Sequence, residues 1–197
     1  MASTGRLGPR LVMRIVGRRA FFGQSLAVVF LGLSRRLGSQ GSFPLRFRPL
    51  ARPVLIPLSE VSTPWRARPF VADAVTLPSA AKPNEPIRIS GQIVRTGTGD
   101  AGPAGLSAVC VLCPHEHCDV DFMSDPKGLP PEVVQEIGRP ITNAVYLCPC
   151  HNSTFSAGDG GRLGGPAPRG LYRFRVTAVT SAAVEIGEVE EDLLVFA

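Results

Sequence analysis

Aromatic residues are scarce in this chain, at 7% of its 197 residues, whereas glycine and proline are common, at 21 and 19 residues. A sequence poor in aromatics and rich in turn formers favours short strands and loops over long helices. Hydrophobic residues make up 44% of the sequence, which excludes a wholly disordered protein and is enough for a buried core. The length allows one ordinary globular domain with a tail.

Acidic residues are absent from the first 59 positions. Residues 1–70 hold twelve arginines against a single acid, Glu60, which is a balance of +11. Residues 71–197 hold nine basic residues against fifteen acids, a balance of −6. The basic character therefore belongs to the N-terminal third. Because the remainder is acidic and has no basic stripe with interleaved aromatics, nucleic-acid binding is not expected.

Hydrophobic runs long enough to cross a bilayer comfortably, about 20 residues, are also missing. The longest mostly apolar run covers residues 20–33 and follows the pair Arg18-Arg19. This pattern predicts a twin-arginine-type signal or membrane anchor over 1–36, with a mitochondrial presequence and a buried helix as alternatives. Residues 37–53, rich in Gly, Pro, Ser and Arg, are expected to form a hinge linker before a domain that begins near Val54.

From residue 54 onward, β-type runs follow one another between turn signals. They cover residues 54–58, 68–77, 87–96, 106–113, 143–148, 171–180, 182–187 and 193–197. Several of these runs alternate apolar and polar residues, which is typical of half-buried strands. The single helical candidate is “PPEVVQEIGRP” (130–140), with prolines in its first turn and Gly138 near its end. We predict an all-β antiparallel fold with one short helix in an insertion at 125–142.

Four of the five cysteines and all three histidines fall in two hexapeptides. The first box is “CPHEHC” (113–118) and the second box is “CPCHNS” (148–153). Two cysteines with two histidines suit either a structural zinc ion or a [2Fe–2S] cluster with both histidines on one iron. The boxes hold more ligands than either site needs, so the residue types alone leave both open. Cys110 lies in an apolar run and is expected to be a buried core residue rather than a redox partner of Cys113.

The two boxes resemble those of the Rieske iron–sulfur proteins, whose pattern is C-x-H-x-x-C followed by C-P-C-H-x-S. The segment “GGPAPRGLYRF” (164–174) is similar to the proline-rich loop that covers the cluster in this family. The similarity extends over about residues 54–197. It implies a Rieske-like antiparallel sandwich with a small cluster-binding subdomain of two loops, at about 107–170.

Carried over residue by residue, the resemblance implies one [2Fe–2S] cluster and a specific set of contacts. The cluster ligands would be Cys113, Cys148, His115 and His151, and a disulfide would join Cys118 to Cys150. Ser153 would donate a hydrogen bond to a bridging sulfide. The loop that covers the cluster would consist of Gly165, Pro166, Ala167 and Pro168. The disulfide is typical of the respiratory members of the family. It also requires an oxidising compartment, which agrees with an export signal.

Four residues depart from the family pattern, and one of them, Asn152 in place of a frequent Gly, is a smaller change with no clear consequence. His117 occupies a position that is usually Gly, and it is expected to be a loop residue whose backbone tolerates a positive φ. Glu116 lies next to His115, where a carboxylate would favour the protonated imidazole. The same charge would weaken docking of this tip into an apolar quinol pocket. Phe155 replaces a Tyr that donates a hydrogen bond to a ligand sulfur. We therefore expect a reduction potential below the top of the Rieske range of about −150 to +300 mV.

The resemblance implies electron transfer as the iron–sulfur subunit of a cytochrome bc-type complex, not catalysis by this chain alone. His115 and His151 would contact quinol, and the electron would pass to a c-type cytochrome beside a b-type subunit. The expected location is the bacterial cytoplasmic membrane, with the domain on the periplasmic face, or the periplasm itself after signal cleavage. Two alternatives are a small Rieske subunit of a periplasmic molybdenum oxidase, such as arsenite oxidase, and a zinc-stabilised β binding domain.

Overall fold

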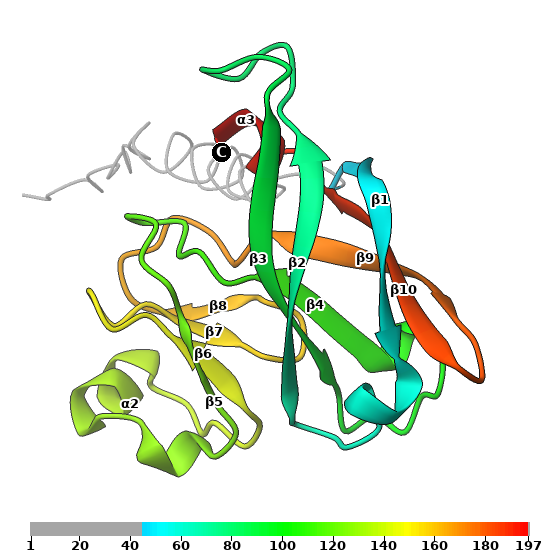
Figure 1. The fold of residues 1–197 in the computed structure, drawn as a ribbon. Coiled ribbons are helices and arrows are strands. Elements are labelled where there is room, and N and C mark those ends of the chain that lie inside the picture. The colour runs from blue at the N-terminus through cyan, green and yellow to red at the C-terminus, as the bar shows by residue number, and fades with distance from the viewer. Residues whose placement is uncertain (1–44, 197) are drawn as a thin grey trace, which may run out of the picture. The chain divides into compact units, whose positions relative to one another are not determined.

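The computed structural model describes residues 45–196, which contain two antiparallel β-sheets (Figure 1). The large sheet has the strand order β1-β10-β9-β4-β3-β2. Its members are β1 (Phe47–Pro57), β2 (Ala67–Val75), β3 (Pro86–Arg95), β4 (Leu106–Cys110), β9 (Arg173–Val179) and β10 (Ala183–Glu190). Every registered strand pair is antiparallel, so the predicted all-β antiparallel class is confirmed for the described residues.

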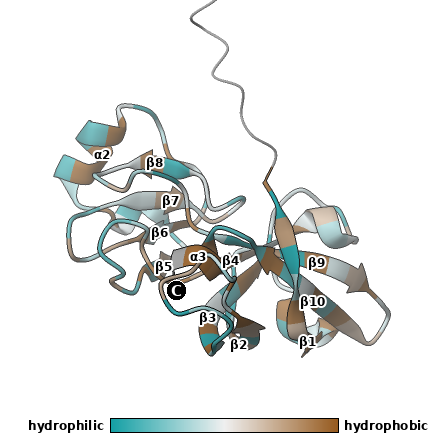
Figure 2. Cartoon of the chain, turned by 90° about the horizontal axis from the view of Figure 1, so that it is seen from above, coloured by the Kyte–Doolittle hydropathy of each residue, from teal (hydrophilic) through white to brown (hydrophobic). Residues whose placement is uncertain are grey.

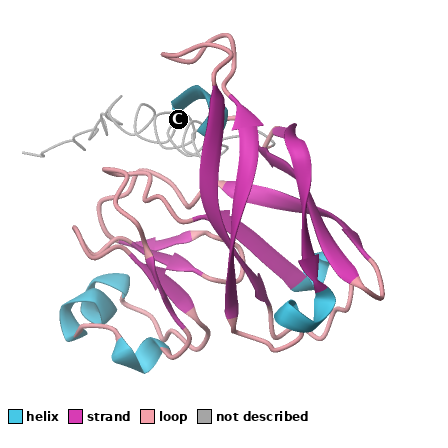
Figure 3. Cartoon of the chain, in the orientation of Figure 1, coloured by secondary structure: helices cyan, strands magenta, loops and turns pink. Residues whose placement is uncertain are grey.

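The small sheet is an insertion between β4 and β9 of the large one. Its order is β5-β6-β7-β8, formed by β5 (Asp121–Met123), β6 (Val145–Leu147), β7 (Thr154–Ser156) and β8 (Arg162–Gly164). Both boxes belong to this insertion, since the first box precedes β5 and the second box joins β6 to β7. Figure 3 shows these short strands beside the helix α2 and apart from the longer strands of the large sheet.

Short helical elements complete the fold. They are α2 (Pro131–Ile137), α3 (Leu193–Phe196) and the 3₁₀ turns Leu58–Val61, Pro103–Gly105 and Pro126–Gly128. The predicted helix of the insertion is confirmed as α2, with Pro131 in its first turn and Gly138 as a left-handed C-cap at φ 65°. Within residues 45–196, no helix is both long enough and apolar enough to span a bilayer.

The core of the large sheet follows the alternation expected of half-buried strands. Along β2, Phe70, Ala72 and Ala74 are buried while their neighbours are more exposed. Phe70 lies directly opposite Gly91 of β3, where a Cβ atom would come within 2.4 Å of the Phe70 ring. Glycine at this position is therefore required by the close approach of the ring, which also meets Phe174 edge-on at 5.0 Å.

The predicted strand at 193–197 is wrong, because residues 193–196 form the one-turn helix α3. Leu193 and Leu194 are both buried, at 4% and 2% exposure, in the core of the large sheet. In a strand, two consecutive side chains would point to opposite faces, whereas a helical turn lets both contact the same core. Figure 2 shows α3 as an apolar segment, while α2 carries both polar and apolar residues.

The predicted domain start near Val54 is also too late, since β1 begins at Phe47. The register of β1 against β10 shifts between Pro49 and Val54, so the strand is bulged where the sequence looks like a linker. Prolines are tolerated there because β1 is an edge strand of the sheet. The predicted signal or anchor at 1–36 and the linker residues before 45 lie outside the described residues.

Candidate metal centre

The two boxes fold into loops with the same backbone hydrogen bonds. In the first box, the Cys113 N–H donates to the Cys118 carbonyl at 2.8 Å and the His117 N–H donates to the Cys113 carbonyl at 2.9 Å. His117, which occupies the position that is usually Gly in the family, has a positive φ of 59°. A side chain other than glycine is strained there, although histidine is among the residues that tolerate this conformation.

The second box repeats this arrangement thirty-five residues later. The Cys148 N–H donates to the Ser153 carbonyl at 2.8 Å, and the Asn152 N–H donates to the Cys148 carbonyl at 3.0 Å. Asn152 has φ 60°, matching His117 in the first box. Two loops of one design thus project from the small sheet, each starting with a cysteine whose backbone is fixed at both ends.

A disulfide joins the two boxes. It links Cys118 to Cys150 with a Cα–Cα distance of 6.6 Å, and this is the pairing that the resemblance implies. Because the Cys118 and Cys150 sulfurs are bonded to one another, they do not serve as thiolate ligands, even though both lie within 4.8 Å of the Cys148 sulfur. Two thiols are left for a metal at this site, those of Cys113 and Cys148.

The Cys113 and Cys148 thiols are buried next to each other, with the residues 1% and 2% exposed. Burial raises the pKa of the Cys113 thiol, and the neighbouring Cys148 sulfur raises it further. Hydrogen bonds from the His115 backbone and the Ser153 hydroxyl lower this pKa, but by less than burial raises it. A buried thiol pair of this kind is suited to a metal, which supplies the positive charge that thiolates need.

The histidines of the site lie nearer the surface. The rings of His115 and His151 meet edge-on with their centroids 4.9 Å apart. The Glu116 carboxylate lies 3.7 Å from Nδ1 of His151, although in sequence it is the neighbour of His115. The His151 side chain is 45% exposed and His115 is partly exposed, whereas the Cys113 and Cys148 thiols are buried.

Residues 165–168, the covering loop, pack against the second box. The Ala167 residue is fully buried, and its N–H donates to Ser153 Oγ at 3.0 Å. Gly165 has φ 85°, and a Cβ atom there would lie 2.3 Å from Ser153 Cα. Only glycine fits this approach, so the loop and Ser153 are held together by sterics as well as by a hydrogen bond.

Three side chains that sequence reasoning missed hold the covering loop in place. Arg162 donates to the Ala167 carbonyl at 2.9 Å, and the Glu136 carboxylate accepts from the Gly165 N–H at 2.7 Å. Arg169 forms ion pairs with the buried Glu190 and with Asp192. The partners of Glu136 and Arg169 are more than twenty positions away, and no local pattern marks them. Arg162, five residues before its partner, also belongs to no motif.

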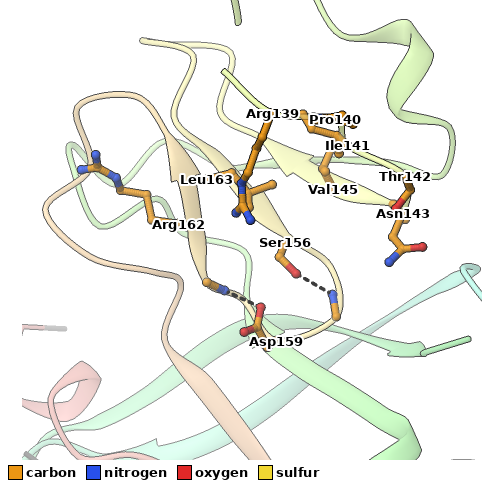
Figure 4. A pocket seen from close by; sticks show the side chains of 13 residues that line it. Arg139, Pro140, Ile141, Thr142, Asn143, Val145, Ser156, Asp159, Arg162 and Leu163 are labelled. Atoms are coloured by element: carbon orange, nitrogen blue, oxygen red, sulfur yellow. Dashed lines mark hydrogen bonds between the residues drawn. The ribbon is translucent and has the colours of Figure 1, made fainter. Parts of the chain in front are cut away.

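A surface hollow of about 420 Å³ lies beside the small sheet, lined by residues of 139–145 and 156–163 (Figure 4). Its polar groups include Ser156, which accepts from the Gly158 N–H, and Asp159, which accepts from the Gly161 N–H. None of the predicted metal ligands lines this hollow. The Cys and His cluster, rather than this hollow, is the candidate functional site, because the hollow contains no cysteine or histidine among its lining residues.

Comparison with known proteins finds no matching family model and no matching curated protein. Among solved structures, the chain is similar to the plasma-membrane Rieske protein PetC3 of the cyanobacterium Synechocystis PCC 6803. The two are 23% identical, with a TM-score of 0.30, and the match covers 58% of this chain and 84% of the other. The residues of the site therefore carry the argument about function.

Proposed function

We propose that this chain is a Rieske-type electron-transfer protein that binds one [2Fe–2S] cluster. Cys113 and Cys148 would ligate the inner iron, and His115 and His151 the outer one. The observation that carries this proposal is the sorting of the ligands. Both thiols are buried, whereas the imidazoles lie at the outer side of the same two loops. A cluster with two cysteines on one iron and two histidines on the other needs this separation.

A zinc ion is the main competitor, since two thiolates and two imidazoles also form a tetrahedral zinc site. A single ion would draw all four ligand atoms onto one centre. A structural zinc site also needs no hydroxyl donor beside its thiolates. Ser153 lies at 0% exposure, with its hydroxyl close enough to Cys113 to lower the pKa of that thiol. Hydrogen bonds to ligand sulfurs are a means of tuning the potential of iron–sulfur sites, and this favours the cluster.

When bound, the cluster would supply one-electron redox chemistry, and the protein would control its surroundings. The buried thiols and the covering loop keep water from the inner side of the site. The outward-facing imidazoles of His115 and His151 can meet a partner and hold a proton at the ring nitrogen that no metal occupies. Pro166 and Pro168 are exposed beside the fully buried Ala167 and would provide an apolar rim for that partner.

For the partner, we propose a cytochrome bc-type complex, with quinol as electron donor and a c-type cytochrome as acceptor. The disulfide between Cys118 and Cys150 supports an oxidising compartment such as the periplasmic side of a membrane. The molybdenum-oxidase alternative is favoured by one observation. The Glu116 carboxylate is 60% exposed at the tip beside His151, where an apolar quinol pocket would have to desolvate it.

Metal and sulfide analysis of the purified protein tests the cluster. We expect about two irons and two acid-labile sulfides per chain, and no zinc. The variants Cys113→Ala and Cys148→Ala should lose both the iron and the acid-labile sulfide. Cys110→Ala is the matched control, because Cys110 is a free buried thiol outside the site, and it should retain full iron and sulfide. Zinc in place of iron, or loss of iron in the Cys110→Ala control alone, would contradict the proposal.

A further inference from the structure

The insertion helix α2 is fixed against the small sheet rather than standing free. Val133 is buried together with Leu129 and Val145 of β6, and Ile137 packs against the same cluster. Ile137 also lies close to Gly164, the last residue of β8, where a Cβ atom would come within 2.9 Å of Ile137 Cγ1. The C-terminal turn of α2 is thereby held next to the start of the covering loop.

Glu136 extends from this turn to the backbone of the covering loop. Its Oε1 accepts a hydrogen bond from the Gly165 N–H at 2.7 Å, a short distance typical of a charged acceptor. An acidic side chain in the last turn of a helix is disfavoured by the helix dipole, and α2 has no basic residue there. The position of Glu136 is therefore not explained by helix stability, but it is explained by the contact with Gly165.

Gly165 is the point where the covering loop meets the second box. Its φ of 85° and its close approach to Ser153 set the direction in which the loop leaves β8. Two residues later, the Ala167 N–H donates to the Ser153 hydroxyl, which lies beside the Cys113 thiol. A change at Gly165 would therefore displace the Ser153 hydroxyl, which lies beside a ligand sulfur.

We propose that Glu136 is a positioning residue of the metal centre, which fixes the covering loop by accepting the Gly165 N–H and so sets the placement of the Ser153 hydroxyl beside Cys113. This inference rests on the proposed function where it concerns the cluster, and on the hydrogen bond alone where it concerns the loop. It assigns the insertion at 125–142 to the support of the site, so that docking to a neighbouring subunit is not needed to explain it.

Amide hydrogen exchange of the segment 164–168, followed by mass spectrometry, tests the contact directly. In Glu136→Ala, exchange should be at least about tenfold faster than in the wild type, because hydrogen bonds to charged groups are among the stronger ones in proteins. Glu136→Gln keeps an acceptor oxygen and should restore most of the protection. Glu132→Ala truncates another exposed glutamate of the same helix and should leave the segment unchanged.

The same variants give a second readout at the site. Glu136→Ala should lose its visible cluster absorbance several-fold faster during incubation and shift its reduction potential, while Glu136→Gln and Glu132→Ala lose absorbance at the wild-type rate. Exchange within about twofold of the wild type in Glu136→Ala, or no rescue in Glu136→Gln, would overturn the inference. If the wild type contains no iron and sulfide, the proposed function fails, yet the exchange measurement still decides whether Glu136 anchors the loop.

Discussion

Ser153 and Phe155 come from the same short segment but contribute differently to the metal centre. Ser153 has a buried hydroxyl that accepts from the Ala167 N–H and lies beside the Cys113 thiol. Phe155 is fully buried in the cluster of side chains that includes Cys113 and Cys148, directly opposite Tyr146 in the small sheet. Phenylalanine offers no hydrogen bond there, so position 155 lacks the hydroxyl donor that the family resemblance implies.

Replacing Phe155 with Tyr should raise the reduction potential. A hydroxyl that donates to a ligand sulfur stabilises the more negative, reduced site, and a gain of about 1 kcal/mol corresponds to some tens of millivolts for one electron. A redox titration of Phe155→Tyr against the wild type measures this, with Phe122→Tyr as a control on a neighbouring aromatic. An unchanged potential with a lower melting temperature would show that the hydroxyl is buried without a partner.

Cys110 provides a prediction on pH dependence. Burial raises the pKa of this thiol from 9.0 to about 11, because the thiolate is poorly solvated in the core. The protonated thiol is favoured in the fold, so its contribution to stability is complete below pH 9 and is lost as the pH rises to about 11. For a shift of this size, the loss is about 3 kcal/mol.

The comparison of wild type with Cys110→Ala isolates this effect. We expect the free energy of unfolding to fall more steeply between pH 9 and about 11 in the wild type than in the variant. Denaturant titrations at several pH values measure it, and both proteins keep the same disulfide. Parallel slopes in the two proteins would contradict the assignment of Cys110 to the core.

At the scale of elements, the first and second boxes are two copies of one loop design joined by a covalent bond. Their backbones are each fixed by two internal hydrogen bonds, but between the boxes the disulfide is the covalent link. It closes a loop with a sequence separation of 32 residues, which contains β5, α2 and β6. The bridge therefore stabilises the insertion as a whole as well as the metal centre.

Removal of the bridge should cost stability and loosen the site. For the double variant Cys118→Ser/Cys150→Ser we expect the free energy of unfolding to fall by about 3–4 kcal/mol, from the loop that the bridge closes. Denaturant unfolding without reductant measures the change. Equal stability of the double variant and the wild type would mean that the boxes are held together by packing alone.

The elements whose sequence signals are local were predicted correctly. The boxes, the covering loop and α2 each have a short motif or a proline and glycine punctuation, and the structure places them together. The strands β5, β7 and β8 have three residues each, too few for a periodic pattern. The start of β1 was hidden by prolines and a bulge, and α3 was hidden by a β-like composition.

The supports of the metal centre could not be predicted for a different reason. The contacts of Glu136 with Gly165 and of Arg169 with Glu190 join residues 29 and 21 positions apart. Such pairs depend on how the small sheet is inserted into the large one, which a single sequence does not reveal. The pairing of Cys118 with Cys150, by contrast, followed from the resemblance and is present in the structure.

At the scale of the whole molecule, charge is divided along the chain. Residues 1–70 carry +11 and residues 71–197 carry −6, so the part that contains the metal centre is acidic. This balance gives no support to a nucleic-acid partner. The export signal or anchor predicted for residues 1–36 remains a prediction, and it is compatible with the disulfide in the described domain.

The central claim, a histidine-ligated [2Fe–2S] site, is tested most directly by low-temperature EPR of the purified protein after mild reduction with ascorbate. We predict a rhombic signal with the low average g value of a cluster that has two histidine ligands on one iron. A signal that appears only with dithionite would still show the cluster. Its reduction potential would then be too low for quinol oxidation, and its redox partner would be one of lower potential. The absence of any such signal under both reductants, with zinc in the protein instead of iron, would contradict the account.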